Sequence, residues 1–350
     1  MTRTGERCDP SLAVPRPRMH ARVLGGMSMS IGSLPHLSFV DAITLSVSAT
    51  DIVTIPSLPR RSPAESMIAQ ALIGIDGVTT GQYGSIAVDP LRINADSPVH
   101  TDLDHDAFRG FRSFLSSAAD FGGPVKWQMV GPITLGISLV RAGVPADTAF
   151  EVAARAVRGH VQNLLTAVAE ALPHHQQIVV LDEPEFGAVR EPGFPLAPDV
   201  AVDLLSGALA VIEPLAIAGV HCCGDADLAS LMASGPALLS IPATMSLLDS
   251  AGYIQRFLER GGWIAWGAVP TDGPMPLSAE RPWKKLCELW CQLVQRGCNP
   301  ALLRQQSLIT PACGLGLHSP AVAERVLRIT AELSARVRDQ AAATRFAFGA

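Results

Sequence analysis

Short apolar runs alternate with longer segments of helical periodicity along almost the whole chain, and this alternation constrains the fold most strongly. Nine runs are predicted as strands, at 26–31, 52–55, 81–87, 125–130, 177–181, 216–222, 238–241, 263–266 and 307–309. Nine segments are predicted as helices, at 38–49, 64–74, 104–120, 147–171, 199–212, 225–234, 250–260, 279–296 and 320–340. Such alternation is typical of parallel βα units, so the chain belongs to the α/β class.

Two α/β architectures contain this many units, the closed (β/α)8 TIM barrel and the doubly wound sheet. A doubly wound dinucleotide-binding fold usually carries G-x-G-x-x-G at its first strand–helix turn. The first turn here reads Gly32-Ser33-Leu34-Pro35, which does not fit that motif. The number of units therefore favours the TIM barrel, whose active site lies where the strands end and the βα loops begin.

Length and composition support one large domain. At about 150 residues per domain, 350 residues suggest two domains, yet a TIM barrel of this size commonly counts as one. We expect a loose tail at 1–22, rich in Arg and Pro, and one barrel at 23–345. Hydrophobic residues make up 48% of the chain, which is enough for a large core.

Charge and cysteine content indicate the compartment and exclude some partners. No basic cluster accompanies the net charge of −5, so nucleic acid is not an expected partner. No apolar run reaches the ~18 residues that span a bilayer, and Met1–Met19 lacks the apolar core of a signal peptide, so no membrane partner is expected. The seven cysteines are odd in number in a long chain, which favours a reducing cytoplasm over a disulfide scaffold.

A histidine and two cysteines form the strongest chemical motif, Val220-His221-Cys222-Cys223-Gly224. In an extended backbone His221 and Cys223 point to one side and Cys222 to the other. Nitrogen and sulfur ligands together suit Zn²⁺, and Cys313, just past a predicted strand, is the best third ligand. The alternative is a hydrogen-bonded core histidine beside small buried cysteines.

Other cysteines and carboxylates allow two interpretations each. Cys287, Cys291 and Cys298 lie on or just after a predicted helix and are expected to be buried helix residues. Asp182 and Glu183 follow an apolar strand, where one carboxylate is expected to reach the barrel mouth and accept a hydrogen bond from a substrate ammonium. The alternative for this pair is a helix cap with a solvated neighbour.

Taken in order, the motifs G-S-L-P, G-P-I-T, D-E-P, H-x-C-G and P-x-C-G-L resemble a known family. The sequence is similar to the C-terminal catalytic half of cobalamin-independent methionine synthase and to zinc methyltransferases of the uroporphyrinogen decarboxylase-like barrel superfamily. The resemblance implies zinc ligands at His221, Cys223 and Cys313. It also implies that Ser33 and Asp182 bind homocysteine, and Glu65 lies near the position of a second acidic contact.

Departures from the family pattern concern the methyl donor. Ala188 and Ser138 stand where the folate enzymes have a ring-contacting glutamate and a stacking tryptophan, and Val269 stands near their proton-donating histidine. An N-methyl group needs protonation to leave, whereas the methyl group of a methylcorrinoid does not. A methylcorrinoid, either methylcobalamin or a corrinoid protein, is therefore the expected donor. Pro242 replaces the glutamate that supplies a fourth zinc ligand, so this ligand is open to water, Glu183 or a main-chain group.

The resemblance thus implies an enzyme, a zinc-dependent methyltransferase that methylates a thiol, with homocysteine giving methionine. Three alternatives stay open: a folate-dependent methionine synthase-like enzyme, a metal-free protein like uroporphyrinogen decarboxylase, and a non-catalytic zinc-binding paralogue. The decarboxylase-like alternative needs an arginine-rich mouth, for which Arg60 and Arg61 are the adjacent pair near a strand end.

Overall fold

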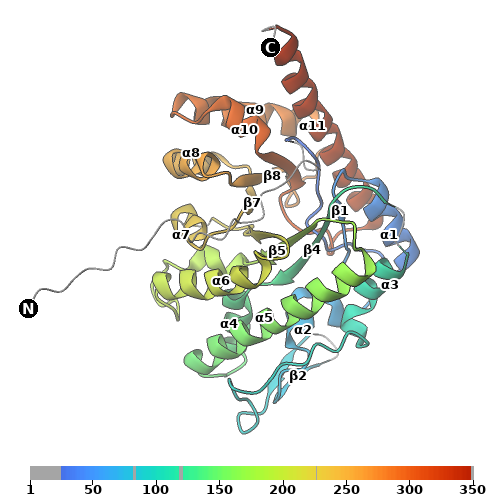
Figure 1. Cartoon of the computed structure of the whole chain (residues 1–350), viewed down its shortest axis with the longest axis vertical. Helices are drawn as coiled ribbons and strands as arrows, with labels where there is room; N and C mark the ends of the chain where they lie inside the picture. The colour runs from blue at the N-terminus through green and yellow to red at the C-terminus, as the bar shows by residue number, and fades with distance from the viewer. Residues whose placement is uncertain (1–24, 82–83, 118–120, 226, 348–350) are drawn as a thin grey trace, which may run out of the picture.

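A curled parallel sheet forms the centre of the protein in a computed structural model, which describes residues 25–81, 84–117, 121–225 and 227–347 (Figure 1). The sheet order is β1-β4-β5-β6-β7-β8-β9, and every neighbouring pair is parallel. Its strands are β1 (Val53–Thr54), β4 (Val125–Val130), β5 (Gln177–Asp182), β6 (Ile217–His221), β7 (Leu238–Pro242), β8 (Trp263–Val269) and β9 (Ser307–Pro311).

The predicted strand at 26–31 would be the eighth strand of this sheet. The structure has an irregular segment there instead. Ser28 forms a parallel bridge with Ile309 in β9, and Met29 forms one with Ile52 just before β1. The two edges of the seven-stranded sheet are therefore both bonded to this segment. Asp51 also accepts hydrogen bonds from the backbone N–H and the hydroxyl of Ser28. The prediction of an α/β fold with a parallel sheet is confirmed, whereas an eight-stranded regular barrel is not what the described residues form.

Helices cover the outer face of the sheet (Figure 1). They are α1 (Phe39–Ser48), α2 (Met67–Leu72), α3 (Arg109–Ser117), α4 (Pro132–Arg141), α5 (Ala146–Ala171), α6 (Pro198–Ile212), α7 (Leu228–Ala233), α8 (Ala251–Glu259), α9 (Glu280–Gln295), α10 (Pro300–Gln305) and α11 (Pro320–Ala347). Short 3-10 helices are η2 (Pro63–Glu65), η3 (Asp106–Phe108), η4 (Pro184–Ala188) and η5 (Met245–Ser250).

Alternation along the strands divides the core into two layers. Val179 and Leu181 of β5 belong to the large cluster between sheet and helices, whereas Ile178 and Val180 belong to a smaller cluster inside the curl. Successive side chains of a strand point to opposite faces, so Asp182 shares the inner face with Ile178 and Val180. The inner face is apolar at the start of the strands and polar where they end.

Besides the segment at 26–31, one predicted strand is wrong, and some helices were not predicted. The predicted strand 81–87 overlaps only the start of β3 (Ile86–Val88), which pairs antiparallel with β2 (Val78–Thr80) outside the main sheet. Helix α4 is one of those not predicted. It begins with Gly131-Pro132, a pair typical of turns, yet proline fits the first position of a helix.

The predicted boundary between the N-terminal tail and the barrel stays a prediction. The predicted tail at 1–22 lies outside the described residues, so the domain limits at 22 and 23 stay a prediction. Within the part of the chain that the structure describes, no helix is both long enough and apolar enough to cross a membrane.

Candidate metal and substrate site

Three neighbouring strands bring polar side chains together at their carboxyl ends. Asp182 of β5 is in register with His221 of β6, and His221 is in register with Ser240 of β7. Register partners on parallel strands point to the same face, so these three side chains share the inner face of the sheet. All three are buried. The polar end of the curl is thus built from the last residues of apolar strands.

His221 has one ring nitrogen bonded and the other free. Its Nδ1 lies 3.0 Å from the Ser240 hydroxyl oxygen. Its Nε2 is buried and has no hydrogen-bond partner among the described residues. A buried polar atom without a partner costs free energy unless a ligand supplies one. This arrangement, with one nitrogen oriented by a neighbour and the other available, is typical of a metal-binding histidine.

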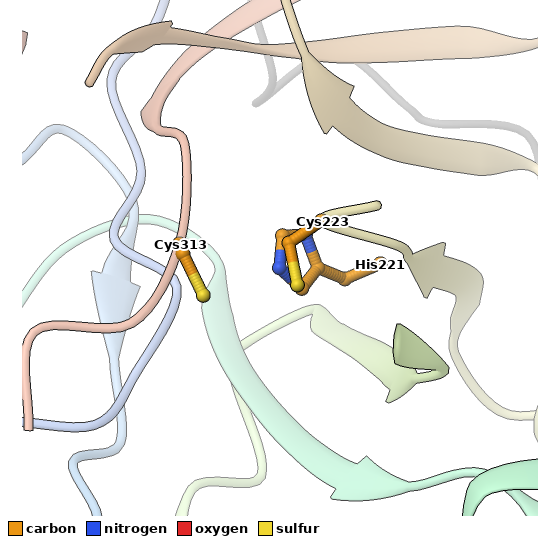
Figure 2. A group of neighbouring side chains, drawn as sticks. All are labelled: His221, Cys223 and Cys313. Carbon is orange, nitrogen blue, oxygen red and sulfur yellow. The ribbon is translucent and has the colours of Figure 1, made fainter. Parts of the chain in front are cut away.

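Two thiols complete a cluster with His221. One ligand atom each from His221, Cys223 and Cys313 lies within 4.8 Å of the other two. Figure 2 shows Cys313, on the loop after β9, next to His221 at the end of β6 and Cys223 two residues further on. One nitrogen and two sulfur donors match the preference of Zn²⁺, and three protein ligands leave a fourth position open. The residues present therefore fit a zinc ion.

The two thiols are coupled to each other. A hydrogen bond with Cys313 lowers the pKa of Cys223 below its ordinary value. The same hydrogen bond with Cys223 raises the pKa of Cys313. The two thiols therefore share one hydrogen bond within the cluster.

The other cysteines that the structure describes are not part of this cluster. Cys222 is fully buried, and burial raises its pKa to about 11. Cys298 is buried too, whereas Cys287 is half-buried and Cys291 is exposed. The predicted burial of Cys291 is wrong, because Leu286, Leu289 and Leu293 form the buried face of α9.

Asp182 has unused hydrogen-bonding capacity. Its Oδ1 is buried without a partner. Burial raises the pKa of this carboxyl, and the charges of His221 and Lys126 act in the opposite direction. The side chain is therefore a carboxylate that a cationic substrate group could complete, and its contact with substrate stays a prediction.

Glu183, expected to contact substrate, instead holds the start of helix α4. Its carboxylate accepts hydrogen bonds from the backbone N–H of Ile133 at 2.9 Å and of Thr134 at 2.8 Å, and from the Thr134 hydroxyl at 2.6 Å. The side chain is fully buried, and burial raises its pKa to about 7. The first N–H groups of a helix need such an acceptor, which explains this orientation.

Glu65, the second acidic residue expected near substrate, is also engaged within the protein. It forms an ion pair with Arg61 at 2.5 Å and accepts hydrogen bonds from the backbone N–H groups of Leu58 and Gly110. Glu65 is 1% exposed, so it joins the loop after β1 to helix α3 from within the core. Arg61 also pairs with Asp106 at 3.0 Å.

Ser33 lies against the loop that carries Cys313. Its hydroxyl accepts a hydrogen bond from the backbone N–H of Gly316, and its carbonyl accepts one from Leu315. A Cβ atom on Gly314 would lie 2.3 Å from the Ser33 hydroxyl, so the close approach of the two loops requires glycine there. Ser33 and Cys313 are therefore brought to the same end of the curl as His221.

Two contributors were not found from the sequence. Ser240 is a lone polar residue in the apolar run of β7, which is the signal that could have revealed it. Lys126 is 1% exposed on β4, and its ammonium donates to the Ile31 carbonyl and to Gln128 Oε1. Burial lowers the pKa of Lys126 to about 8. A lysine inside an apolar strand sequence is the corresponding signal.

A cavity of about 850 Å³ opens beside the two clustered thiols. Cys223 and Cys313 line it, together with residues of β7, α7, η5 and the loop after β8, whereas Asp182 and Ser33 do not. The cavity therefore gives access to the two thiols.

The sequence matches no family model and no curated protein. Among solved structures, it is similar to a B12-independent methionine synthase from Shewanella sp. W3-18-1 in complex with selenomethionine, with 17% identity, TM-score 0.59, and coverage of 87% of this chain and 89% of that one. A methyltransferase from Methanosarcina mazei has 15% identity and TM-score 0.52, with 90% and 94% covered. A Listeria monocytogenes protein assigned as a vitamin-B12-independent methionine synthase has 16% identity and TM-score 0.51, with 77% of each chain covered. At these identities the likeness shows a shared fold.

Proposed function

We propose that the protein is a zinc-dependent methyltransferase that methylates the thiol of a homocysteine-like amino acid. The observation that carries this proposal is the buried Nε2 of His221, unpartnered among the described residues, on a ring of which one nitrogen lies within 4.8 Å of two thiols. Such a nitrogen in a folded protein calls for a ligand, and the donor set suits zinc. The functions given for the structural neighbours, methionine synthase and methyltransferase, agree with the same chemistry.

His221, Cys223 and Cys313 would hold the metal. Bound there, zinc would supply the positive charge that lets an acceptor thiol lose its proton near neutral pH. Ser240 fixes the histidine ring through Nδ1, so that Nε2 faces the two cysteines. Cys222, buried on the opposite side, has a structural role.

The acceptor is proposed from the free carboxylate oxygen. Asp182 lies next to His221 in the sheet, and its Oδ1 lacks a partner, so an amino acid's ammonium group would complete it. Ser33 lies on the neighbouring loop, where its turn could hold the carboxylate of the same amino acid. The Shewanella structure contains selenomethionine, an amino acid of this kind.

The donor is proposed to be one whose methyl group leaves without protonation. Val269, at the position of the family's proton donor, is fully buried at the end of β8 and carries no acid. The sequence favours a methylcorrinoid on this ground. The B12-independent neighbours lend the corrinoid no support, so the donor has to be settled by direct comparison.

The decarboxylase-like alternative gains nothing from the structure. Arg61 pairs with Glu65 and Asp106, and Arg60 donates to the carbonyl of His318. Arg61 is therefore held by two carboxylates, and only the exposed Arg60 keeps free donors, so this pair does not form the arginine-rich mouth that propionates need.

The test is methyl transfer to homocysteine by the zinc-loaded protein, with methionine measured by mass spectrometry. Methylcobalamin and methyltetrahydrofolate are compared at equal concentration, with metal-stripped protein and Cys313→Ser as controls. The proposal expects methionine that depends on zinc and on Cys313, with little from the folate. Zinc-loaded protein that forms no thioether with any donor would contradict it and favour a non-catalytic zinc-binding protein.

A further inference from the structure

The cavity beside Cys223 and Cys313 carries an acidic lining. Among its lining residues are three carboxylates, Asp225, Asp227 and Asp272, and one cation, Arg190. Arg190 is already paired with Asp227, at 2.5 Å between Nε and Oδ2. Asp225 and Asp272 are exposed and form no ion pair within the described residues. The lining therefore carries two carboxylates without an ion pair among the described residues, and its one cation is already paired.

One residue of the lining carries an unsatisfied polar group. Thr271 is 3% exposed, and its hydroxyl oxygen has no hydrogen-bond partner in the part of the chain that the structure describes. It belongs to the lining just after β8, close to Asp272 in sequence. Buried polar groups without a partner are rare in folded proteins, so Thr271 is a group that a ligand could satisfy.

We propose that this cavity binds the methyl donor as an organic cation, a sulfonium or quaternary ammonium compound, with its methyl group toward Cys223 and Cys313. The inference rests on the proposed function and specifies the chemical class of the methyl donor. Carboxylates attract such a cation, and the apolar residues of the lining, such as Leu228 and Leu247, suit its carbon substituents. A polyanionic folate would meet Asp225 and Asp272 without a free cation to neutralise its carboxylates.

Methyl transfer from a sulfonium or quaternary ammonium donor to a thiolate needs no acid. The acceptor thiol gives its proton to solvent, and its thiolate forms the new C–S bond to the methyl carbon. The donor's own bond to that carbon breaks, and the electron pair stays on the donor's sulfur or nitrogen, which leaves neutral. The buried Val269 at the end of β8 is therefore no obstacle to this reaction.

A binding experiment tests the cavity without relying on turnover. Calorimetry on the full zinc-loaded chain compares choline with 3,3-dimethylbutan-1-ol, a neutral compound of the same shape. We expect choline to bind about tenfold or more tightly, and Asp225→Asn with Asp272→Asn to weaken choline about tenfold at low salt. Thr271→Val tests the hydroxyl, and Asp199→Asn, an exposed carboxylate of α6 outside the lining, is the matched control. Equal binding of the two compounds, or no effect of the double variant, would overturn the inference.

A turnover experiment separates this inference from the proposed function. With trimethylsulfonium as donor, homocysteine should yield methionine and dimethyl sulfide, faster than with methylcobalamin or methyltetrahydrofolate. If methylcobalamin alone gives methionine, the cationic donor is wrong and the methyltransferase stands. If choline binds through the two aspartates but no donor gives methionine, the cation site stands and the methyltransferase is wrong.

Discussion

The Nδ1 atom of His221 lies 3.0 Å from the hydroxyl oxygen of Ser240, its register partner on the next strand. This contact leaves Nε2 as the nitrogen that faces Cys223 and Cys313, within the 4.8 Å cluster. The orientation of the ring is thus set by the sheet itself, before any metal binds. A hydrogen bond of this kind orients a metal-binding histidine and increases its basicity.

Ser240→Ala should weaken zinc binding by about 10- to 100-fold, because the ring loses the partner that orients it. Competition with a chromophoric chelator measures the affinity. Ser234→Ala is the matched control, since Ser234 is also buried but its hydroxyl donates to the Leu231 carbonyl rather than to a histidine. Equal zinc affinity in both variants would show that Ser240 does not orient the ligand.

Asp182→Asn should raise the KM for homocysteine about tenfold or more while zinc content stays intact. Loss of a hydrogen bond to a charged group costs about 1.5–3 kcal/mol, and Asp182 is proposed to pair with the ammonium. Steady-state kinetics with homocysteine and with a thiol that lacks an ammonium group provide the comparison. A KM that rises equally for both thiols would argue against the ammonium contact.

Glu183→Ala should lower the free energy of unfolding by about 2–4 kcal/mol, because it leaves the buried donors at the start of α4 without an acceptor. Urea denaturation measures this change. Glu185→Ala is the control, since its ion pair with the largely exposed Arg141 is worth about 1 kcal/mol or less. Unchanged stability with lost zinc would make Glu183 a metal ligand instead.

Lys126 should make the free energy of unfolding depend on pH in the alkaline range. Burial lowers its pKa to about 8 from 10.5, so between these values the unfolded chain binds a proton that the folded protein does not. The free energy of unfolding contributed by this group therefore rises with pH, by about 2 kcal/mol from pH 8 to 9.5. Urea denaturation of the protein and of Lys126→Met at both pH values isolates the effect. A difference between them that does not change with pH would mean that Lys126 titrates normally.

Apolar periodicity predicted most of the architecture, because strands buried on both faces and long amphipathic helices leave clear patterns. It failed where backbone geometry decides. The segment at 28–29 bonds to Ile309 and Ile52 by single bridges, which no side-chain pattern announces. The segment 81–87 was predicted as one strand, whereas only 86–87 of it pair, as part of β3 with β2.

The site, like the fold, could be predicted from the sequence only in part. Spacing indicated that His221 and Cys223 share a side, and the structure brings Cys313 to them from the other end of the chain. The sequence did not show which of the two adjacent carboxylates, Asp182 or Glu183, would face the site. Their directions depend on the groups that pack against each side chain. The N-terminus of α4 attracts Glu183, and the inner face of the sheet takes Asp182. Sequence adjacency alone cannot distinguish these two environments.

X-ray absorption at the zinc edge tests the central claim most directly. The purified protein should hold about one zinc per chain, with two sulfur ligands at about 2.3 Å and one histidine nitrogen at about 2.0 Å. Cys223→Ser and Cys313→Ser should each remove one sulfur and most of the zinc, whereas Cys222→Ser, the matched control next to Cys223, should change neither. Zinc retained with two sulfur ligands in Cys313→Ser, or zinc lost equally in Cys222→Ser, would contradict a centre formed by His221, Cys223 and Cys313.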